Sequence, residues 1–429
     1  MSSVLLVEEN HDLPLVRAQL TLRTGAADDP LDSDGLTNFA TELMGRGAAG
    51  KTRTELDLAF DALGASLETV TDADGVTFEV TVLKTKLEDA LALMADVILR
   101  PDFPEEEAAR LTREIRSQLD ELRDEDGHLA RRFFNRALYG THPYGRTVIG
   151  TARTLESLSV SDARGWHKQW VKSGQAIFGF AGDLAKPEAE AALERHFSSL
   201  PSSSRAPLVR YPDPPTRQGM RLTLVDKPDR TQSQILLGQP APQWGTPEFY
   251  ALQVATCAYG GTFTARLMNE VRSKRGLSYG ASARVAQGRG RRALVVHVFP
   301  SLEQTAETLE LVLGLHADWV KSGITADELE FSRGYLASSF AFGIATPEDR
   351  LELRTGLELD GLPHDYAQTF PSKIRAVTLE ETRRVMHDYL TASDLEVCVV
   401  STVDELQPKL DAAGLLSRFT VERVAHDSY

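Results

Sequence analysis

The chain repeats one order of predicted elements twice, and this repeat restricts the possible folds more than any other feature. A strand pattern at 14–25 and helical patterns at 34–63 are followed by a hairpin pattern at 65–83, two more helices and a closing strand. Strands, helices, a hairpin at 277–300, long helices and a closing strand then recur in the same order. The repeat predicts an α+β fold of two homologous halves, each a mostly antiparallel sheet covered by helices.

A stretch rich in Pro and Ser, "LPSSSRAPLVRYPDPPTRQG", separates the two halves. Such composition is typical of an exposed linker or an extended arm. The chain of 429 residues is also longer than one hydrophobic core usually serves. We therefore predict a first domain at 1–200, a linker at 201–218 and a second domain at 219–429.

The charge of the chain limits its partners. The formal net charge is −15, which argues against nucleic acid or an anionic membrane as the main partner. One local exception is "RVAQGRGRR" (284–292), which places four arginines near a Gly-rich turn. We interpret this segment as a solvated hairpin tip, with a patch that faces a substrate or a partner as the alternative.

Cysteine content and hydropathy indicate the compartment. Cys257 and Cys398 are the only cysteines, so the chain has neither a disulfide framework nor a Cys-based zinc site. We expect both to be small buried residues in a reducing environment. The sequence shows no apolar run long enough to cross a membrane, and its start lacks the pattern of a signal peptide. These features predict a cytoplasmic protein, or a periplasmic one if a signal peptide has been trimmed.

The segment "GRGAAGKT" (45–52) matches the phosphate-binding pattern G-x-x-x-x-G-K-[ST]. A genuine phosphate loop follows a buried strand, because that strand aims the amides of the next helix at the phosphate. Here Leu36, Phe39 and Leu43 have helical spacing instead, with Ser33 or Asp34 as a possible cap. We therefore expect a turn between two helices, with Lys51 and Thr52 opening the second one. A nucleotide hydrolase remains an alternative.

The same helix carries a resemblance. "DGLTNFATELMGRGAAGKT" (34–52) resembles the first conserved helix of the pitrilysin/insulinase-type, or mitochondrial-processing-peptidase-like, zinc peptidases. In that family the helix reads G-x-x-H-F-x-E-H, where two His bind zinc and Glu is the general base. Further segments resemble the family at 7–30, 142–151 and 266–280. The resemblance implies two homologous halves that close around a peptidase chamber.

The residues that would hold and use zinc are changed in this chain. Asn38, Thr41 and Glu42 stand at the positions of His, Glu and His. An amide oxygen is a weak zinc ligand, and a threonine hydroxyl does not ionise near neutral pH. The resemblance places the third ligand at Glu114 in "RLTREIRSQ". We therefore expect no catalytic zinc and no metal of its own in this chain.

The second half keeps a different part of the family site. The family places an Arg seven residues before a Tyr, and "RSKRGLSY" supplies Arg272 and Tyr279 at that spacing. We predict a buried helical stripe of Phe263, Leu267 and Val271, with Arg272 at its margin and a helix end at Gly276. The resemblance implies that Arg272 holds peptide carbonyls and that Tyr279 donates to the oxyanion. A surface Arg and an edge-strand Tyr without function are the alternative.

Together these features predict a non-catalytic subunit that binds substrate in a heterodimeric zinc peptidase. The expected partner is a homologous chain with an intact H-x-x-E-H that carries the zinc, and the expected substrate is a peptide or an unfolded polypeptide. The alternative is a degenerate homologue that serves as a structural scaffold in an assembly.

Overall fold

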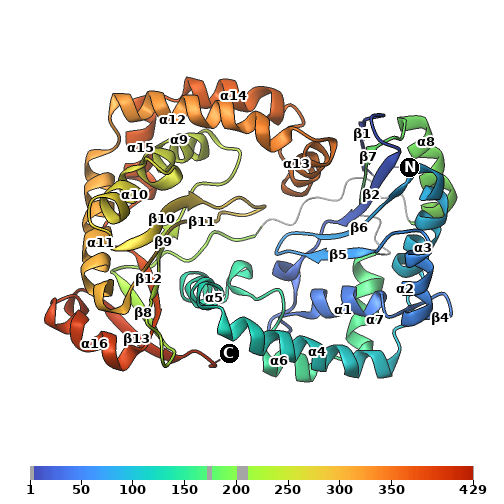
Figure 1. The fold of residues 1–429 in the computed structure, drawn as a ribbon, viewed down its shortest axis with the longest axis horizontal. Helices are drawn as coiled ribbons and strands as arrows, with labels where there is room; N and C mark the ends of the chain where they lie inside the picture. The colour runs from blue at the N-terminus through green and yellow to red at the C-terminus, as the bar shows by residue number, and fades with distance from the viewer. Residues whose placement is uncertain (1–3, 172–175, 201–210, 429) are drawn as a thin grey trace. The chain divides into compact units, whose positions relative to one another are not determined.

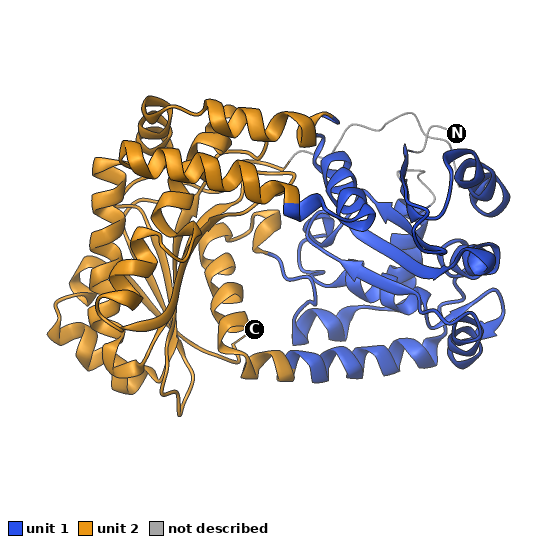
Figure 2. Ribbon diagram, turned by 45° about the horizontal axis from the view of Figure 1, so that its top comes forward, with its two compact units in different colours: residues 1–119, 146–209, 342–364 blue, residues 120–145, 210–341, 365–429 orange. Residues whose placement is uncertain are grey.

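A computed structural model describes residues 4–171, 176–200 and 211–428. The chain divides into two compact units (Figure 2). Unit 1 comprises residues 1–119, 146–209 and 342–364, and unit 2 comprises residues 120–145, 210–341 and 365–429. Each unit has its own sheet, covered by helices, which confirms the predicted α+β class. Residues 201–210 of the predicted linker lie outside the described residues.

The sheet of unit 1 has the strand order β1-β7-β2-β6-β5. β1 pairs with β7 in parallel, and the other neighbours are antiparallel. Alternating apolar residues of β2 and β6, such as Leu20 and Phe78, face a buried core. The strands are β1 (Val4–Glu9), β2 (Leu15–Leu22), β5 (Glu68–Thr71), β6 (Val76–Leu83) and β7 (Ala176–Gly182).

Helices cover this sheet because each presents an apolar stripe to it. α3 packs against β6 and α8, while α1 packs against α7 and β5 (Figure 1). The main helices are α1 (Leu36–Met44), α2 (Arg53–Asp61), α3 (Leu87–Leu99), α7 (Val160–Trp170) and α8 (Lys186–Phe197). The long helix α4 (Glu105–Asp124) begins in unit 1 and ends in unit 2.

The sheet of unit 2 has the order β10-β11-β9-β12-β8-β13. The pairs from β10 to β12 are antiparallel, whereas β8 pairs in parallel with both β12 and β13. The strands are β8 (Arg221–Asp226), β9 (Gln234–Pro240), β10 (Ser278–Val285), β11 (Ala293–Pro300), β12 (Glu396–Ser401) and β13 (Thr420–Ala425). The main helices are α9 (Pro247–Thr256), α11 (Thr305–Ser322), α12 (Ala326–Ser339), α14 (Tyr366–Ala376), α15 (Leu379–Tyr389) and α16 (Val403–Ala412).

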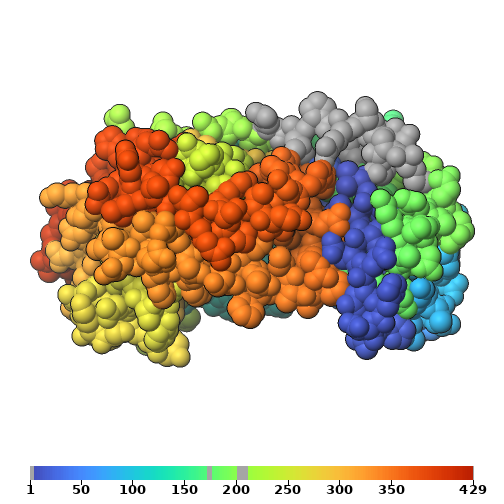
Figure 3. Space-filling view, turned by 90° about the horizontal axis from the view of Figure 1, so that it is seen from above, coloured from blue at the N-terminus to red at the C-terminus, as the bar shows by residue number. Residues whose placement is uncertain are grey.

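Each unit also contains one helix from the other sequence half. α13 (Pro347–Asp360) packs on β1 and β7 of unit 1, and its orange surface borders the dark-blue surface of β1 in Figure 3. A buried ion pair fixes it there, with Arg23 Nη2 donating to Glu358 Oε2 across 2.8 Å. In unit 2, α5 (Asp126–Tyr139) packs on β8, β9 and β12. The compact units therefore differ from the sequence halves 1–200 and 219–429 by this exchange.

The arginine-rich segment 284–292 is not the solvated hairpin tip expected from its composition. Arg289 is buried, and Arg292 Cζ lies 4.0 Å from the centroid of the Tyr144 ring. The amide of Gln243 donates to the carbonyls of Gly288 and Arg289. Stacking on tyrosines and hydrogen bonding therefore fold this loop into unit 2, a use of arginine that composition does not show.

Two other expectations concern burial and hydropathy. Cys257 and Cys398 are both free and buried, as predicted, and burial raises the pKa of each thiol. Among the helices of the described residues, none has the length and apolar character needed to cross a bilayer.

Candidate functional site

Helix α1 carries the positions of the altered metal motif, and an aspartate from outside the helix holds its first turn. The helix begins after Gly35, whose φ of 91° lies in the left-handed region. Asp29, rather than Ser33 or Asp34, accepts hydrogen bonds from the amides of Gly35 and Thr37, each 3.0 Å long. The Thr37 hydroxyl adds a bond of 2.6 Å to the same carboxyl group. Asp29 thus satisfies amides that the helix itself leaves unpaired.

Burial and hydrogen bonding act on Asp29 in opposite directions. Burial raises the pKa of Asp29 to about 7, although the bonds from Thr37 and Gly35 lower it. The indole of Trp166 on α7 donates to the Thr37 hydroxyl across 2.9 Å, so α7 also fixes this end of α1. Sequence analysis missed Asp29 because it caps the helix from several residues upstream, outside the usual capping position.

Thr41 stands at the position of the general base, and its hydroxyl is already engaged. It is buried and lies 2.9 Å from the carbonyl oxygen of Thr37 and 3.1 Å from the hydroxyl of Thr71 on β5. Asn38, one turn earlier on the same helix, is half-buried. The Thr41 hydroxyl therefore joins α1 to the sheet, and it cannot take a proton from water near neutral pH.

Glu42 and Glu114 come together as the resemblance implied, but an arginine lies with them. Arg46, in the turn that follows α1 and four residues after Glu42, has a side chain that is only 7% exposed. Its Nη2 donates to Glu114 Oε2 across 2.6 Å, and its Nη1 lies 3.5 Å from Glu107 Oε2. Arg53 Nη1 lies 3.6 Å from Glu114 Oε1. With Arg110, whose Nε lies 3.2 Å from Glu114 Oε1, three guanidinium groups thus balance the charge of Glu114, where a metal ion would have to bind.

The pKa values follow from this arrangement. Burial raises the pKa of Glu42, an effect that Arg46 and Arg53 oppose and the nearby charge of Glu114 reinforces. The hydrogen bond from Arg46 holds the pKa of Glu114 below its usual value. The pKa values of Glu42 and Glu114 therefore shift in opposite directions, because burial dominates at Glu42 and hydrogen bonding to arginine dominates at Glu114.

These residues do not fit zinc. Asn38 and Thr41 lack strong donor atoms, and each carboxylate oxygen of Glu114 lies beside the guanidinium of an arginine. Within residues 4–171, 176–200 and 211–428, no group of three His, Cys, Asp or Glu side chains could hold a metal ion. The chemistry of the site is therefore that of an ion-pair cluster.

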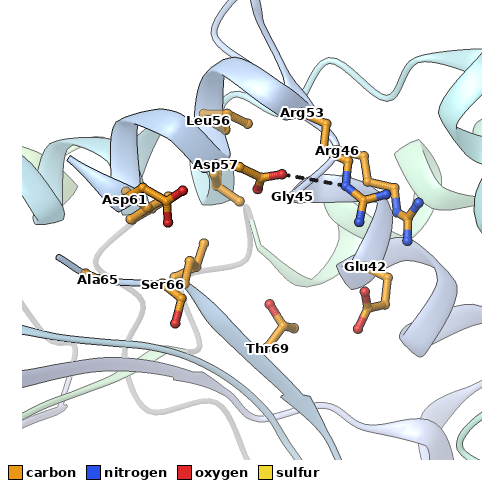
Figure 4. A pocket seen from close by; sticks show the side chains of 13 residues that line it. Glu42, Gly45, Arg46, Arg53, Leu56, Asp57, Asp61, Ala65, Ser66 and Thr69 are labelled. Atoms are coloured by element: carbon orange, nitrogen blue, oxygen red, sulfur yellow. Dashed lines mark ion pairs between the residues drawn. The ribbon is translucent and has the colours of Figure 1, made fainter. Parts of the chain in front are cut away.

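A pocket of about 330 Å³ opens beside Glu42 and Arg46 (Figure 4). Its floor is apolar, with Leu56 and Phe60 from α2, and its rim is charged. Arg53 forms an ion pair of 3.9 Å with Asp57 at this rim, where Figure 4 draws the dashed line. The remaining lining residues are Gly45, Asp61, Ala65, Ser66, Leu67, Thr69 and Val97.

The segment Gly45–Thr52 has no phosphate-loop geometry. The element before it is α1, and the segment itself forms a small antiparallel pair of β3 (Gly47–Ala48) and β4 (Lys51–Thr52). Lys51 Nζ lies 2.8 Å from Asp96 Oδ2, so its charge is paired. Thr52 opens α2 as predicted, because its hydroxyl accepts from the amide of Glu55 in a capping box.

The second candidate site is the segment before β10 in unit 2. Arg272 lies in a π-helical turn, Asn269–Ser273, that follows the short helix α10 (Arg266–Met268). The helical geometry ends at Ser273, and the chain turns towards β10 at Gly276, the residue predicted to end the helix, whose φ is 65°. The amides of Gly276 and Leu277 donate back to the carbonyls of Arg272 and Val271, and so satisfy carbonyls at the end of this turn. Helix and strand are thereby joined by a short turn.

This turn brings Arg272 and Tyr279 together. Arg272 Cζ lies 4.7 Å from the centroid of the Tyr279 ring and 4.9 Å from that of the Phe263 ring. Tyr279 is 79% exposed and Phe263 is 64% exposed. Leu267 and Val271 are fully buried as predicted. The expectation that Phe263 continues their stripe is wrong, because the helix begins only at Arg266.

Comparisons with known proteins identify the family and the fold of the chain. Residues 4–152 match the sequence pattern of the insulinase family, peptidase family M16. Residues 157–335 match the pattern described as the peptidase M16 inactive domain. The fold is similar to the crystal structure of a peptidase M16 inactive domain from Pseudomonas fluorescens, with a TM-score of 0.84 and 24% identity over 93% of this chain and 95% of that one.

Two curated relatives carry different descriptions. The chain is 26% identical to an uncharacterized zinc protease of Mycobacterium bovis, over 86% of this chain and 84% of the relative. It is 20% identical to a protein of Helicobacter pylori described as a non-peptidase homolog, over 92% of this chain and 91% of the relative. Relatives of this chain thus bear names of both the peptidase and the non-peptidase kind.

Proposed function

Because this chain belongs to the insulinase family of peptidases, family M16, we propose that it is a non-catalytic subunit that binds substrate in a heterodimeric zinc peptidase. The partner is a homologous chain with an intact H-x-x-E-H helix, and that chain holds the zinc. The substrate is a peptide or an unfolded polypeptide. This chain alone hydrolyses nothing.

One observation supports the proposal. The family's zinc-binding and base residues are changed at the first candidate site, whereas its Arg and Tyr are both present at the second. At α1, arginines neutralise the carboxylates, and Thr41 replaces the base. At β10, by contrast, Arg272 and Tyr279 are adjacent, and the phenol is exposed. A guanidinium and a phenol at such a place can donate hydrogen bonds to a peptide carbonyl and to an oxyanion. We infer that Arg272 holds the peptide and that Tyr279 stabilises the developing negative charge.

Co-expression tests the proposal. The chain is produced with a homologue from the same genome that contains H-x-x-E-H, and the purified pair is tested on an unfolded polypeptide and on fluorogenic peptides. The proposal requires stable co-purification and an activity that the homologue lacks by itself. A homologue that is fully active without this chain contradicts it. Co-purification in which substitution of Arg272 and Tyr279 changes nothing favours the structural scaffold instead.

A further inference from the structure

Phe263 is the residue of the second site that sequence analysis did not assign to function. It lies three residues before α10 and is 64% exposed, although a phenylalanine stabilises a fold most when it is buried. Phe331 and Tyr335 on α12, which are also exposed, pack on each other with ring centroids 6.1 Å apart. Phe263 instead packs on the guanidinium of Arg272. We call Phe263, Arg272 and Tyr279 the aromatic–arginine cluster.

Arg272 differs from the neighbouring basic residues in that its charge is not paired with a carboxylate of the described residues. Lys274 and Arg275 both pair with Glu270, and Arg266 pairs with Glu328. No ion pair joins Arg272 to any residue that the structure describes. Its guanidinium lies over the rings of Phe263 and Tyr279, and these rings offer no oxygen or nitrogen acceptor on their faces to its N–H donors. Stacking thus orients the donors without satisfying them.

We propose that Phe263 is a positioning and specificity-determining residue of this site. Its ring contacts the guanidinium of Arg272 from the segment before α10, and the ring of Tyr279 contacts the same guanidinium from β10. Together the two exposed rings form an apolar flank beside the donors. The ligand class that fits is a peptide with a large apolar side chain next to the carbonyl or carboxylate group that Arg272 holds. This inference rests on the proposed function, since it assumes that Arg272 binds peptide.

Peptide binding to the full chain tests the inference. The probes are fluorescein-labelled nonapeptides of Ser, Ala and Gly, without or with a single Phe that is moved through the central positions. Binding is followed by fluorescence anisotropy. The native chain should bind the best Phe peptide about tenfold more tightly than the peptide without Phe, as expected for partial burial of one aromatic side chain.

Four variants separate the roles. Phe263→Ala should remove the preference for Phe and weaken binding of every peptide, whereas Phe263→Leu should keep much of the preference and lose the stacking on Arg272. Phe331→Ala is the matched control, because it removes an exposed aromatic ring outside the cluster, and it should bind like the native chain. Arg272→Ala should weaken binding of all peptides. Circular dichroism and thermal unfolding check that each variant is folded.

The outcomes are distinguishable. If Arg272→Ala weakens binding but Phe263→Ala leaves both affinity and preference unchanged, this inference is overturned and the proposed function stands. If Arg272→Ala has no effect, or no peptide binds saturably, both are overturned. A loss of preference in Phe331→Ala equal to that in Phe263→Ala would also overturn the inference, because the effect would not be specific to the cluster.

Discussion

Arg46 donates to the carboxylate of Glu114 across 2.6 Å, beside Glu42, where the family resemblance places two zinc ligands. The buried guanidinium provides positive charge that a metal ion would otherwise provide. The difference from the family's metal site thus extends beyond residues 38, 41 and 42, because Arg46 already balances the negative charge of Glu107 and Glu114. Four predictions follow from the geometry around α1 and one from the second site.

The first prediction concerns metal. The purified chain should hold no stoichiometric zinc when its metal content is measured by mass spectrometry. Restoring the motif with Asn38→His, Thr41→Glu and Glu42→His should give only weak zinc binding, because Glu114 still forms an ion pair with Arg46. Adding Arg46→Met should tighten binding by roughly tenfold or more, since a cation no longer opposes the ion. One tightly bound zinc per native chain would contradict this account.

The second prediction concerns stability. Arg46→Ala should lower the free energy of unfolding by about 1–3 kcal/mol, because it leaves Glu107 and Glu114 without their buried partner. The partial exposure of Glu114 keeps the cost below that of a fully buried pair. Urea unfolding measures it. A double variant, Arg46→Met with Glu114→Gln, should recover part of the loss; if it is no more stable than Arg46→Ala, the charge argument is wrong.

The third prediction concerns the Gly-Lys-Thr sequence. Lys51→Ala should change the free energy of unfolding by at most about 1 kcal/mol, because the pair with Asp96 is partly exposed. Activity of the assembled complex should be unaffected. Calorimetric titration with ATP and GTP should show no binding. Saturable nucleotide binding that Lys51→Ala abolishes would instead support a phosphate loop.

The sequence predicted the class of the fold, the degenerate metal motif and the proximity of Arg272 to Tyr279. These depend on local patterns: helical spacing in α1, and the turn at Gly276 that places Tyr279 soon after Arg272. Long-range relationships were not predictable. Arg46 meets a carboxylate 68 residues away, and α13 exchanges to the other unit. The sequence predicted Phe263 in the buried stripe because its spacing from Leu267 and Val271 is helical, whereas the helix begins only at Arg266.

The fourth prediction concerns pH. The pKa of Asp29 is raised from 3.8 in the unfolded reference to about 7 in the folded chain. The folded state therefore holds this proton more tightly, so the stabilising contribution is complete below about pH 4 and is lost as the pH rises towards 7. Asp29→Asn should remove that decline, although the substitution lowers stability through a weaker cap. Urea unfolding across this pH range measures both effects.

Asp32→Asn provides the matched control for pH, because Asp32 is nearby and exposed. Its unfolding free energy should follow the pH profile of the native chain. If Asp29→Asn also follows the native profile, burial of Asp29 does not govern the pH dependence.

The fifth prediction is the central one. In a complex with its zinc-bearing homologue, Tyr279→Phe should lower turnover by about 10²–10³, the usual cost of removing one oxyanion donor. Assembly, measured by size-exclusion chromatography, should be unchanged. Arg272→Ala should also raise KM, because arginine supplies several donors to the peptide.

Turnover of the assembled complex with Tyr279→Phe is therefore the most direct measurement of the shared-site account. The account predicts a complex that assembles normally and turns over about 10²–10³ times more slowly than the native pair. An assembled complex with unchanged turnover, for this variant and for Arg272→Ala, would contradict it and identify the chain as a structural scaffold.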